Sequence, residues 1–312
     1  MKLLFFFAVS LFFTALAFAQ PDLSKPLGKT IADTGSEFYR FETFRMDSED
    51  GERHYKITVG IPKTQKPESG FPVIYLLDGN SAIAAMNERM FSEIAKKELP
   101  VIVAIGYETP LRFDVVARAF DYTPPTLDGS ESMAEKERGR KGGGADIFAE
   151  FIEKKIKPRV ESFVSIDRKR QTIWGHSYGG LFVLNTLFKH SKMFQHYFVA
   201  DPSLWRETET ILNMEKTFIE KEKETELRLV IAVGNNNGKR DNERVLQRQN
   251  SAIPPNSASD MSHRLVDVLK SSAFQTFDGL GHGEVFTASI EPAIRFCVQT
   301  ENFDSQQNGR KP

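Results

Sequence analysis

A serine flanked by glycines is the residue of this chain best placed to do chemistry. Residues 172–174 are apolar and predict a short strand, Gly-His-Ser-Tyr-Gly follows at residues 175–179, and an apolar helical pattern comes next. This G-x-S-x-G pattern between a strand and a helix is typical of a tight turn that exposes a nucleophilic serine at a sheet edge. Gly175 and Gly179 are expected to be required, because a Cβ there would collide with neighbouring backbone. Ser177 is therefore the predicted nucleophile.

A serine hydroxyl needs a neighbouring base to react at neutral pH. Where this turn occurs in enzymes, the acid and then the histidine follow the serine along the chain. Among the histidines after Ser177, His282 alone lies in a glycine-rich loop, residues 279–283, directly after a predicted strand. We therefore expect His282 to be the general base. His176 is the immediate neighbour of Ser177, so its side chain is expected to turn away and to have a structural role.

The acid that would orient the histidine has several candidates. The loop after the predicted strand 227–233 carries Asp241 and Glu243, and a carboxylate there would hold the imidazole in the correct tautomer. Both residues lie well beyond the end of the strand, where they are equally well interpreted as solvated loop charges. Three alternatives thus stay open: Asp241, Glu243, or a Ser177–His282 dyad without an acid.

An oxyanion hole for acyl transfer needs two N–H donors. Tyr178 is expected to supply one, because its N–H lies at the start of the helix and points toward charge that develops beside Ser177. The second is expected from the loop after the apolar strand 73–77, at Asn80 or the adjacent Gly79.

Composition and charge place the chain among ordinary globular proteins. It has 312 residues, 40% apolar and 27% charged, with a formal net charge of −1, so no general attraction to nucleic acid is expected. Residues 1–19 have the basic start, apolar run and small-residue cleavage site of a signal peptide. We expect an exported chain, in a periplasm, with no stable membrane anchor after cleavage. The single cysteine, Cys297, has no internal disulfide partner.

Strands alternate with helices along the chain, which predicts an α/β fold with a mostly parallel sheet and helices on both faces. Residues 20–36 are a polar lead-in, 37–300 a single domain, and 301–312 a polar tail. Within the domain, residues 108–144 are rich in proline, glycine and charge and are predicted to be an irregular lid or pocket segment. No metal-ligand cluster or cofactor motif is visible, so no cofactor is expected.

Several stretches of the chain resemble one family of esterases. They are residues 76–80, 106–107, 118–124, 141–144, 166–184, 202–204 and 281–283. With them, the chain resembles the esterase-D-like family of α/β hydrolases over residues 37–298. Within that family it is most similar to the periplasmic esterases of trilactone siderophores such as enterobactin and salmochelin. The resemblance implies the α/β-hydrolase fold, Ser177 as nucleophile and His282 as base, and an acid position that can be missing.

The resemblance also implies a small ester or lactone substrate, with a ferric catecholate siderophore as the leading candidate and any iron arriving with it. Basic residues would hold such an anion: Arg112, Arg118, Arg138, Arg140 and Lys141. Tyr107 and Trp205 would add aromatic surfaces to the substrate site. Such surfaces suit a sugar or a phenolic acid equally, so the alternative enzyme is a carbohydrate-linked deacetylase or feruloyl esterase. A non-catalytic binding protein on the same fold is the alternative from another class.

Overall fold

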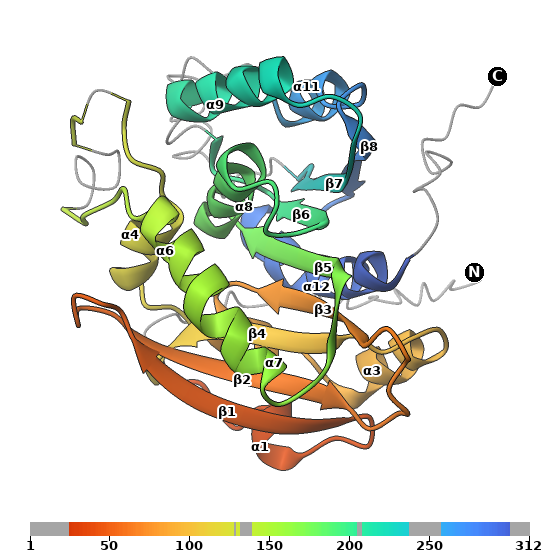
Figure 1. Ribbon diagram of the computed structural model, residues 1–312. Helices are drawn as coiled ribbons and strands as arrows, with labels where there is room; N and C mark the ends of the chain where they lie inside the picture. Colours follow the sequence, from red (N-terminus) through yellow and green to blue (C-terminus); the bar gives the residue numbers. More distant parts are fainter. Residues whose placement is uncertain (1–24, 128, 132–138, 205–207, 237–256, 300–312) are drawn as a thin grey trace, which may run out of the picture.

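One sheet of eight strands forms the centre of the computed structural model, which describes residues 25–127, 129–131, 139–204, 208–236 and 257–299 (Figure 1). The strand order is β1-β2-β4-β3-β5-β6-β7-β8. The strands are β1 (Tyr39–Asp47), β2 (His54–Pro62), β3 (Phe71–Leu76), β4 (Val101–Tyr107), β5 (Ile166–His176), β6 (His196–Ala200), β7 (Thr225–Gly234) and β8 (Leu269–Phe277). β2 is antiparallel to both β1 and β4, and the other neighbouring pairs are parallel. The predicted mostly parallel sheet is confirmed.

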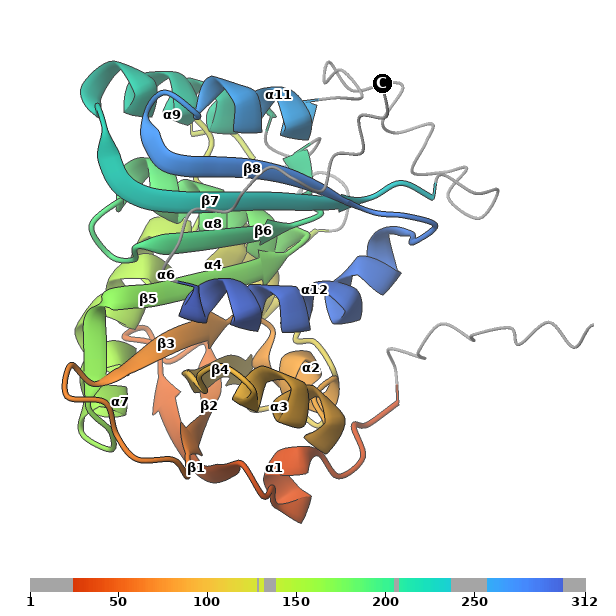
Figure 2. The same ribbon diagram turned by 90° about the vertical axis from the view of Figure 1, so that its right-hand side faces the viewer.

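Helices cover both faces of this sheet (Figure 2). One face carries α1 (Ile31–Thr34), α2 (Gly79–Ala84), α3 (Glu88–Ala95) and α12 (His282–Val298). The other carries α4 (Ala117–Tyr122), α6 (Ala145–Phe151), η1 (Ile152–Ile156), α7 (Lys157–Glu161), α8 (Tyr178–Lys189), α9 (Thr208–Lys221) and α11 (Ser257–Arg264). Every residue of β3 and β4 is buried, because both faces of these strands are covered, and this explains their unbroken apolar runs.

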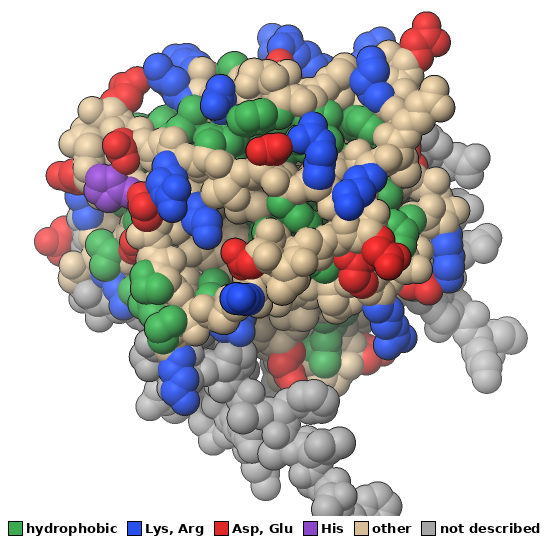
Figure 3. All heavy atoms as spheres, turned by 90° about the horizontal axis from the view of Figure 1, so that it is seen from below, with side chains coloured by type: hydrophobic (Ala, Val, Ile, Leu, Met, Phe, Trp, Pro, Cys, Tyr) green, Lys and Arg blue, Asp and Glu red, His purple; other side chains and the backbone are tan. Residues whose placement is uncertain are grey.

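The edge strand β1 carries charge of both signs. Arg40 and Arg45 are exposed on it, and Glu42 lies between them. Viewed from below β1, basic and acidic side chains are interspersed over the surface of the molecule (Figure 3). Charged side chains on an edge strand oppose its pairing with a strand of another chain.

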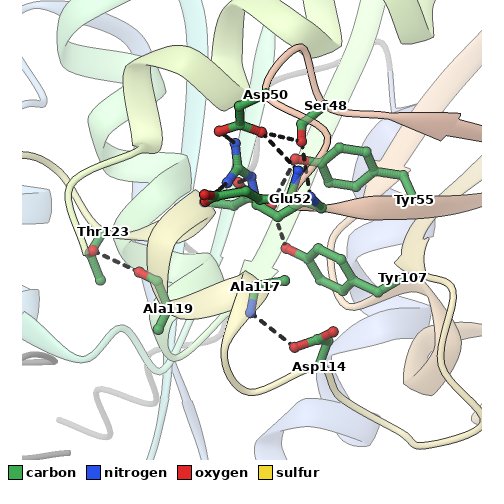
Figure 4. Close-up of polar contacts among 11 residues, drawn as sticks. Ser48, Asp50, Glu52, Tyr55, Tyr107, Asp114, Ala117, Ala119 and Thr123 are labelled. Atoms are coloured by element: carbon green, nitrogen blue, oxygen red, sulfur yellow. Dashed lines mark hydrogen bonds and ion pairs between the residues drawn. The ribbon is translucent and has the colours of Figure 1, made fainter. Parts of the chain in front are cut away.

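Two predicted segments differ in the structure. Residues 108–144, expected to be irregular, contain α4, whose start is capped because the Asp114 carboxylate accepts hydrogen bonds from the N–H groups of Val116 and Ala117 (Figure 4 shows the latter). The glycine-rich loop expected to contain His282 ends before it, since α12 begins at His282 itself. The Glu284 carboxylate accepts a hydrogen bond from the Gly281 N–H at 2.8 Å and so fixes this helix start.

Both ends of the chain fall outside the described residues, namely the predicted signal peptide at 1–19 and the predicted tail at 301–312. No helix in the described part of the chain combines the length and the apolar character needed to cross a membrane.

Candidate functional site

Residues that follow four strands of the sheet meet at its carboxyl edge. Parallel strands end at the same edge, which is where ligand sites form in open α/β sheets. The residues are Asp78 after β3, Ser177 after β5, Asp201 after β6 and His282 beyond β8. The site is therefore a direct product of the parallel topology.

The turn between β5 and α8 holds Ser177 in a strained backbone conformation, with φ 60° and ψ −114°. A Cβ at Gly175 would lie 2.3 Å from the Gly179 carbonyl oxygen, so Gly175 is required, as expected. The same expectation for Gly179 is wrong, because a Cβ there would meet Leu77 Cδ1 at 3.4 Å, an ordinary contact. The close approach of residues 175 and 179 therefore requires glycine at position 175 but not at position 179.

Three side chains form a continuous line of contacts at this turn. The Ser177 Oγ lies 3.0 Å from His282 Nε2, and His282 Nδ1 lies 3.1 Å from Asp201 Oδ2. The contact between His282 Nδ1 and Asp201 Oδ2 is close but lacks the alignment of a straight hydrogen bond. Catalytic hydrogen bonds are often loose before substrate binds, so this geometry suits a working acid–base pair. The His282 and Asp201 side chains are 9% and 7% exposed, which shields them from water.

Asp201 is the site residue that sequence reasoning missed. It directly follows β6, the strand beside β5, and its N–H donates to the Ala232 carbonyl of β7 at 2.7 Å. Its φ of 40° lies in the left-handed region, and its carboxylate faces His282 Nδ1. The predicted acids Asp241 and Glu243 lie outside the described residues. An aspartate immediately after the buried strand next to the serine turn was the available signal.

His176 contacts both the backbone and the ring of His282. Its Nε2 donates to the His282 carbonyl oxygen at 2.7 Å, and the two imidazole centroids are 4.7 Å apart. Burial, and then the neighbouring His282, lowers the pKa of His176 to about 3, so this ring stays neutral at working pH. Through its bond to the His282 carbonyl, His176 fixes the backbone at the start of α12.

The two segments expected to supply the oxyanion donors lie next to each other. Tyr178 is the first residue of α8, and its N–H lies in the first turn of that helix. The loop at residues 78–80 is adjacent, since Asp78 Oδ2 lies 3.9 Å from the position of a Cβ on Gly179. The Asn80 side chain is fully engaged with the end of β4 and the loop after it, where its Nδ2 donates to three carbonyl oxygens at 3.0–3.2 Å. Any donor role at Asn80 therefore falls on its backbone N–H in α2, next to Gly79.

Arg118, expected to contact substrate, forms an ion pair with a carboxylate of the protein itself. Its Nε and Nη2 donate to the two Asp78 carboxylate oxygens, both at 2.8 Å. Burial alone would lower the pKa of Arg118, but the Asp78 charge outweighs it and the pKa lies above its ordinary value. The guanidinium also lies over the Tyr178 ring, 5.4 Å from its centroid. Arg118 thereby joins α4, the loop after β3 and the serine turn.

Tyr107, also expected to contact substrate, is buried, with 3% of the residue exposed. Tyr55 and Tyr107, from neighbouring strands β2 and β4, point into one buried polar cluster (Figure 4). Their hydroxyls donate to Asp121 Oδ2 at 3.0 and 2.9 Å, and Arg53 Nε lies 3.1 Å from Asp121 Oδ1. Tyr107 therefore anchors α4 to the sheet.

The remaining predicted substrate residues fall into two groups. Trp205 and Arg138 lie outside the described residues. Arg112 and Arg140 are half-buried, and no carboxylate among the described residues pairs with Arg112. Lys141 is exposed, and its Nζ lies over the Phe120 ring, 5.2 Å from the ring centroid. Within the described ranges, no three His, Cys, Asp or Glu side chains are grouped as a metal site requires.

Known esterases match this chain over most of its length. The model of the Esterase family matches residues 48–282. The chain is 37% identical over 290 residues to the apo-salmochelin esterase of Escherichia coli O6:H1 (strain CFT073), with 92% of this chain and 87% of that protein covered. It is 34% identical over 273 residues to the ferri-bacillibactin esterase BesA of Bacillus subtilis (strain 168), with 83% and 90% covered.

Solved structures agree with these matches. The complex of enterobactin hydrolase IroE with DFP has a TM-score of 0.69 at 34% identity, over 86% of this chain and 98% of that one. Siderophore hydrolase EstA from Aspergillus nidulans has a TM-score of 0.67 at 26% identity, over 82% and 93%. The predicted α/β-hydrolase fold is confirmed. Together with the family match, these relatives show that the chain is a serine-hydrolase-type esterase that belongs to the Esterase family.

Proposed function

We propose that this esterase works through an acyl-enzyme on Ser177, with His282 as general base and Asp201 as the acid that orients it. The observation that carries the proposal is the line of contacts from Ser177 Oγ to His282 at 3.0 Å and from His282 to Asp201 at 3.1 Å. The three residues follow three different strands, so the fold itself brings them together.

The proposed mechanism follows from which nitrogen carries the proton. Asp201 facing Nδ1 favours a proton there and leaves Nε2 to accept the Ser177 O–H. As Ser177 Oγ attacks the ester carbonyl, His282 takes its proton and returns it to the leaving alcohol. Water then hydrolyses the acyl-enzyme with the same proton transfers. The backbone N–H groups of Tyr178 and of Asn80 or Gly79 are the proposed donors to the oxyanion.

The proposed substrate is a catecholate trilactone siderophore of the enterobactin or salmochelin type. The relatives are named for salmochelin, bacillibactin and enterobactin, which supports this choice. The position of Arg112 supports the same substrate. The carbonyl oxygen of the preceding residue, Leu111, accepts a hydrogen bond from Asn80, which lies in the loop beside the serine turn. A guanidinium there would attract an anionic catecholate. We also propose that the predicted signal peptide directs the protein to a periplasm.

Hydrolysis assays on a panel of esters test the mechanism and the substrate separately. The purified protein is expected to hydrolyse p-nitrophenyl butyrate and enterobactin, in iron-free or ferric form, and Ser177→Ala to abolish both activities. Activity retained in Ser177→Ala would overturn the mechanism. Turnover of p-nitrophenyl butyrate without any turnover of enterobactin or salmochelin would overturn the substrate only.

Feruloyl esters and acetylated xylan complete the panel. Faster turnover of either than of enterobactin would favour the alternative enzyme, although Tyr107, one of its two expected aromatic surfaces, is buried in the core. No turnover of any ester, with no covalent labelling of Ser177, would favour a binding protein.

Cell fractionation tests the proposed export. The protein recovered from the periplasmic fraction is expected to begin at Gln20. A protein that keeps residues 1–19 and stays in the cytoplasmic fraction would contradict export.

A further inference from the structure

A second serine touches the nucleophile. Ser203 lies in the turn after β6, is 2% exposed, and its Oγ is 2.9 Å from Ser177 Oγ. Its backbone N–H also donates to the Ser177 carbonyl oxygen at 3.2 Å. Both the main chain and the side chain of Ser203 are thus directed at Ser177.

The position of Ser203 is fixed by its surroundings. Two residues earlier, Asp201 is tied to β7 through its N–H bond to Ala232. Pro202 packs against α8, since a Cβ on Gly180 would lie 3.0 Å from it. The same short turn therefore presents a carboxylate to His282 and a hydroxyl to Ser177.

Counting protons gives the direction of the Ser177–Ser203 hydrogen bond. Ser177 has one hydroxyl proton, and in the reactive arrangement it is donated to His282 Nε2. Ser203 must then be the donor and Ser177 Oγ the acceptor. If Ser177 instead donated to Ser203, His282 would have no proton to take, so that arrangement does not react.

We propose that Ser203 is a catalytic residue that stabilises negative charge on Ser177 Oγ, an inference that rests on the proposed function. During attack, Oγ gains negative charge as its proton passes to His282. During deacylation, Oγ is the leaving atom and gains negative charge again. A hydrogen bond to a charged oxygen is stronger than one to a hydroxyl or an ester oxygen, so the Ser203 contact strengthens at the charged steps.

The rate of covalent inactivation by a fluorophosphonate measures the reactivity of Ser177 directly. Removal of the hydroxyl in Ser203→Ala is expected to slow this rate, and the acylation and deacylation rates on p-nitrophenyl acetate, by about 10- to 100-fold. Ser203→Cys, which fills the site with a weaker donor, is expected to react at a rate between those of Ser203→Ala and the wild type.

The molecule contains a matched control. Ser262 is also 2% exposed, and its Oγ lies 3.2 Å from the Oγ of half-buried Ser272, which forms a serine pair between α11 and β8. Ser262→Ala removes the same kind of contact outside the proposed site and is expected to change the inactivation rate by less than about twofold. Melting temperatures of both alanine variants verify that the comparison is made on folded protein.

The outcomes separate this inference from the proposed function. If wild type is labelled at Ser177 and both Ser203 variants react within twofold of it, the role of Ser203 is wrong and the proposed function stands. An equal loss in Ser203→Ala and Ser262→Ala would also overturn the role of Ser203. If wild type is not labelled at Ser177, the proposed function itself fails.

Discussion

Asp78 and Asp201 occupy corresponding places in the molecule but face different kinds of partner. Each follows a strand at the carboxyl edge of the sheet, with left-handed φ values of 51° and 40°, and as whole residues they are 2% and 5% exposed. Asp78 binds both nitrogens of the Arg118 fork at 2.8 Å. Asp201 approaches a single nitrogen of His282 at 3.1 Å.

The partner decides what each carboxylate does. A guanidinium paired with a carboxylate keeps its proton at any working pH, so the Asp78–Arg118 pair holds α4 over the serine turn and does no acid–base chemistry. An imidazole can gain and lose a proton near neutral pH, so Asp201 beside His282 can stabilise the charge that forms during a reaction. Two aspartates in similar backbone conformations thus give a structural pair and a proposed catalytic pair.

The same substitution at the two positions should separate these roles, and the larger effect on activity is expected at Asp201. Asp201→Asn keeps the size of the side chain and tolerates the left-handed backbone, but its amide no longer favours the proton on Nδ1. We expect kcat to fall by about 10²- to 10⁴-fold, with little change in the free energy of unfolding. Steady-state kinetics and urea unfolding measure both quantities. A kcat within fivefold of wild type would show that the site works as a dyad.

Asp78→Asn should instead act mainly on stability. It leaves Arg118, whose side chain is 13% exposed, without its carboxylate, and breaking a largely buried pair in this way costs about 3–5 kcal/mol of the free energy of unfolding. The double variant Asp78→Asn/Arg118→Met removes the unpaired charge and is expected to be more stable than Asp78→Asn alone. Equal urea midpoints for Asp78→Asn and wild type would show that the pair carries no such role.

The dependence of the free energy of unfolding on pH should also differ between the two regions, because His176 lies in the region of Asp201. Its pKa is about 3 in the folded protein and ordinarily 6.5, so below pH 6.5 the unfolded chain binds a proton that the folded chain excludes. The stability contribution is complete above pH 6.5 and is lost as pH falls toward 3, by up to about 1.4 kcal/mol per pH unit. Arg118, on the Asp78 side, stays charged throughout.

His176→Asn tests this contribution by difference from wild type. Burial raises the pKa of Asp121 to about 7, which gives a pH dependence of opposite sign, and buried His196 has a pKa of about 3. Both groups are present in wild type and in His176→Asn, so they cancel. Urea unfolding at pH 7, 6 and 5 should show a smaller loss of stability toward acid in the variant. Parallel curves would contradict the assignment.

Local sequence patterns predicted the Ser177–His282 part of the site. Each pattern spans only a few residues: a glycine-flanked serine after an apolar strand, and a histidine after the last strand. In the structure, Ser177 Oγ lies 3.0 Å from His282 Nε2. The mostly parallel sheet followed from the alternation of apolar strands with helices. Such features are determined by neighbours along the chain, so local patterns report them.

The parts that the sequence did not reveal depend on contacts between distant segments. Asp201 reaches His282 because β6 lies beside β5, the strand that leads to Ser177. Local sequence patterns do not predict the order of strands in a sheet. Arg118 was expected to bind an anionic substrate, but an anionic partner 40 residues earlier, Asp78, already binds it. Tyr107 points inward because Asp121 and Tyr55 meet it there. In each case the partner decides the role, as it does for the two aspartates.

Mass spectrometry of the protein after reaction with a fluorophosphonate tests the central claim most directly, because the reagent labels a serine only where a base activates it. We expect one adduct per wild-type chain, on the peptide that contains Ser177, and none in Ser177→Ala. An unlabelled wild-type protein, or an adduct on another residue that persists in Ser177→Ala, would contradict the account.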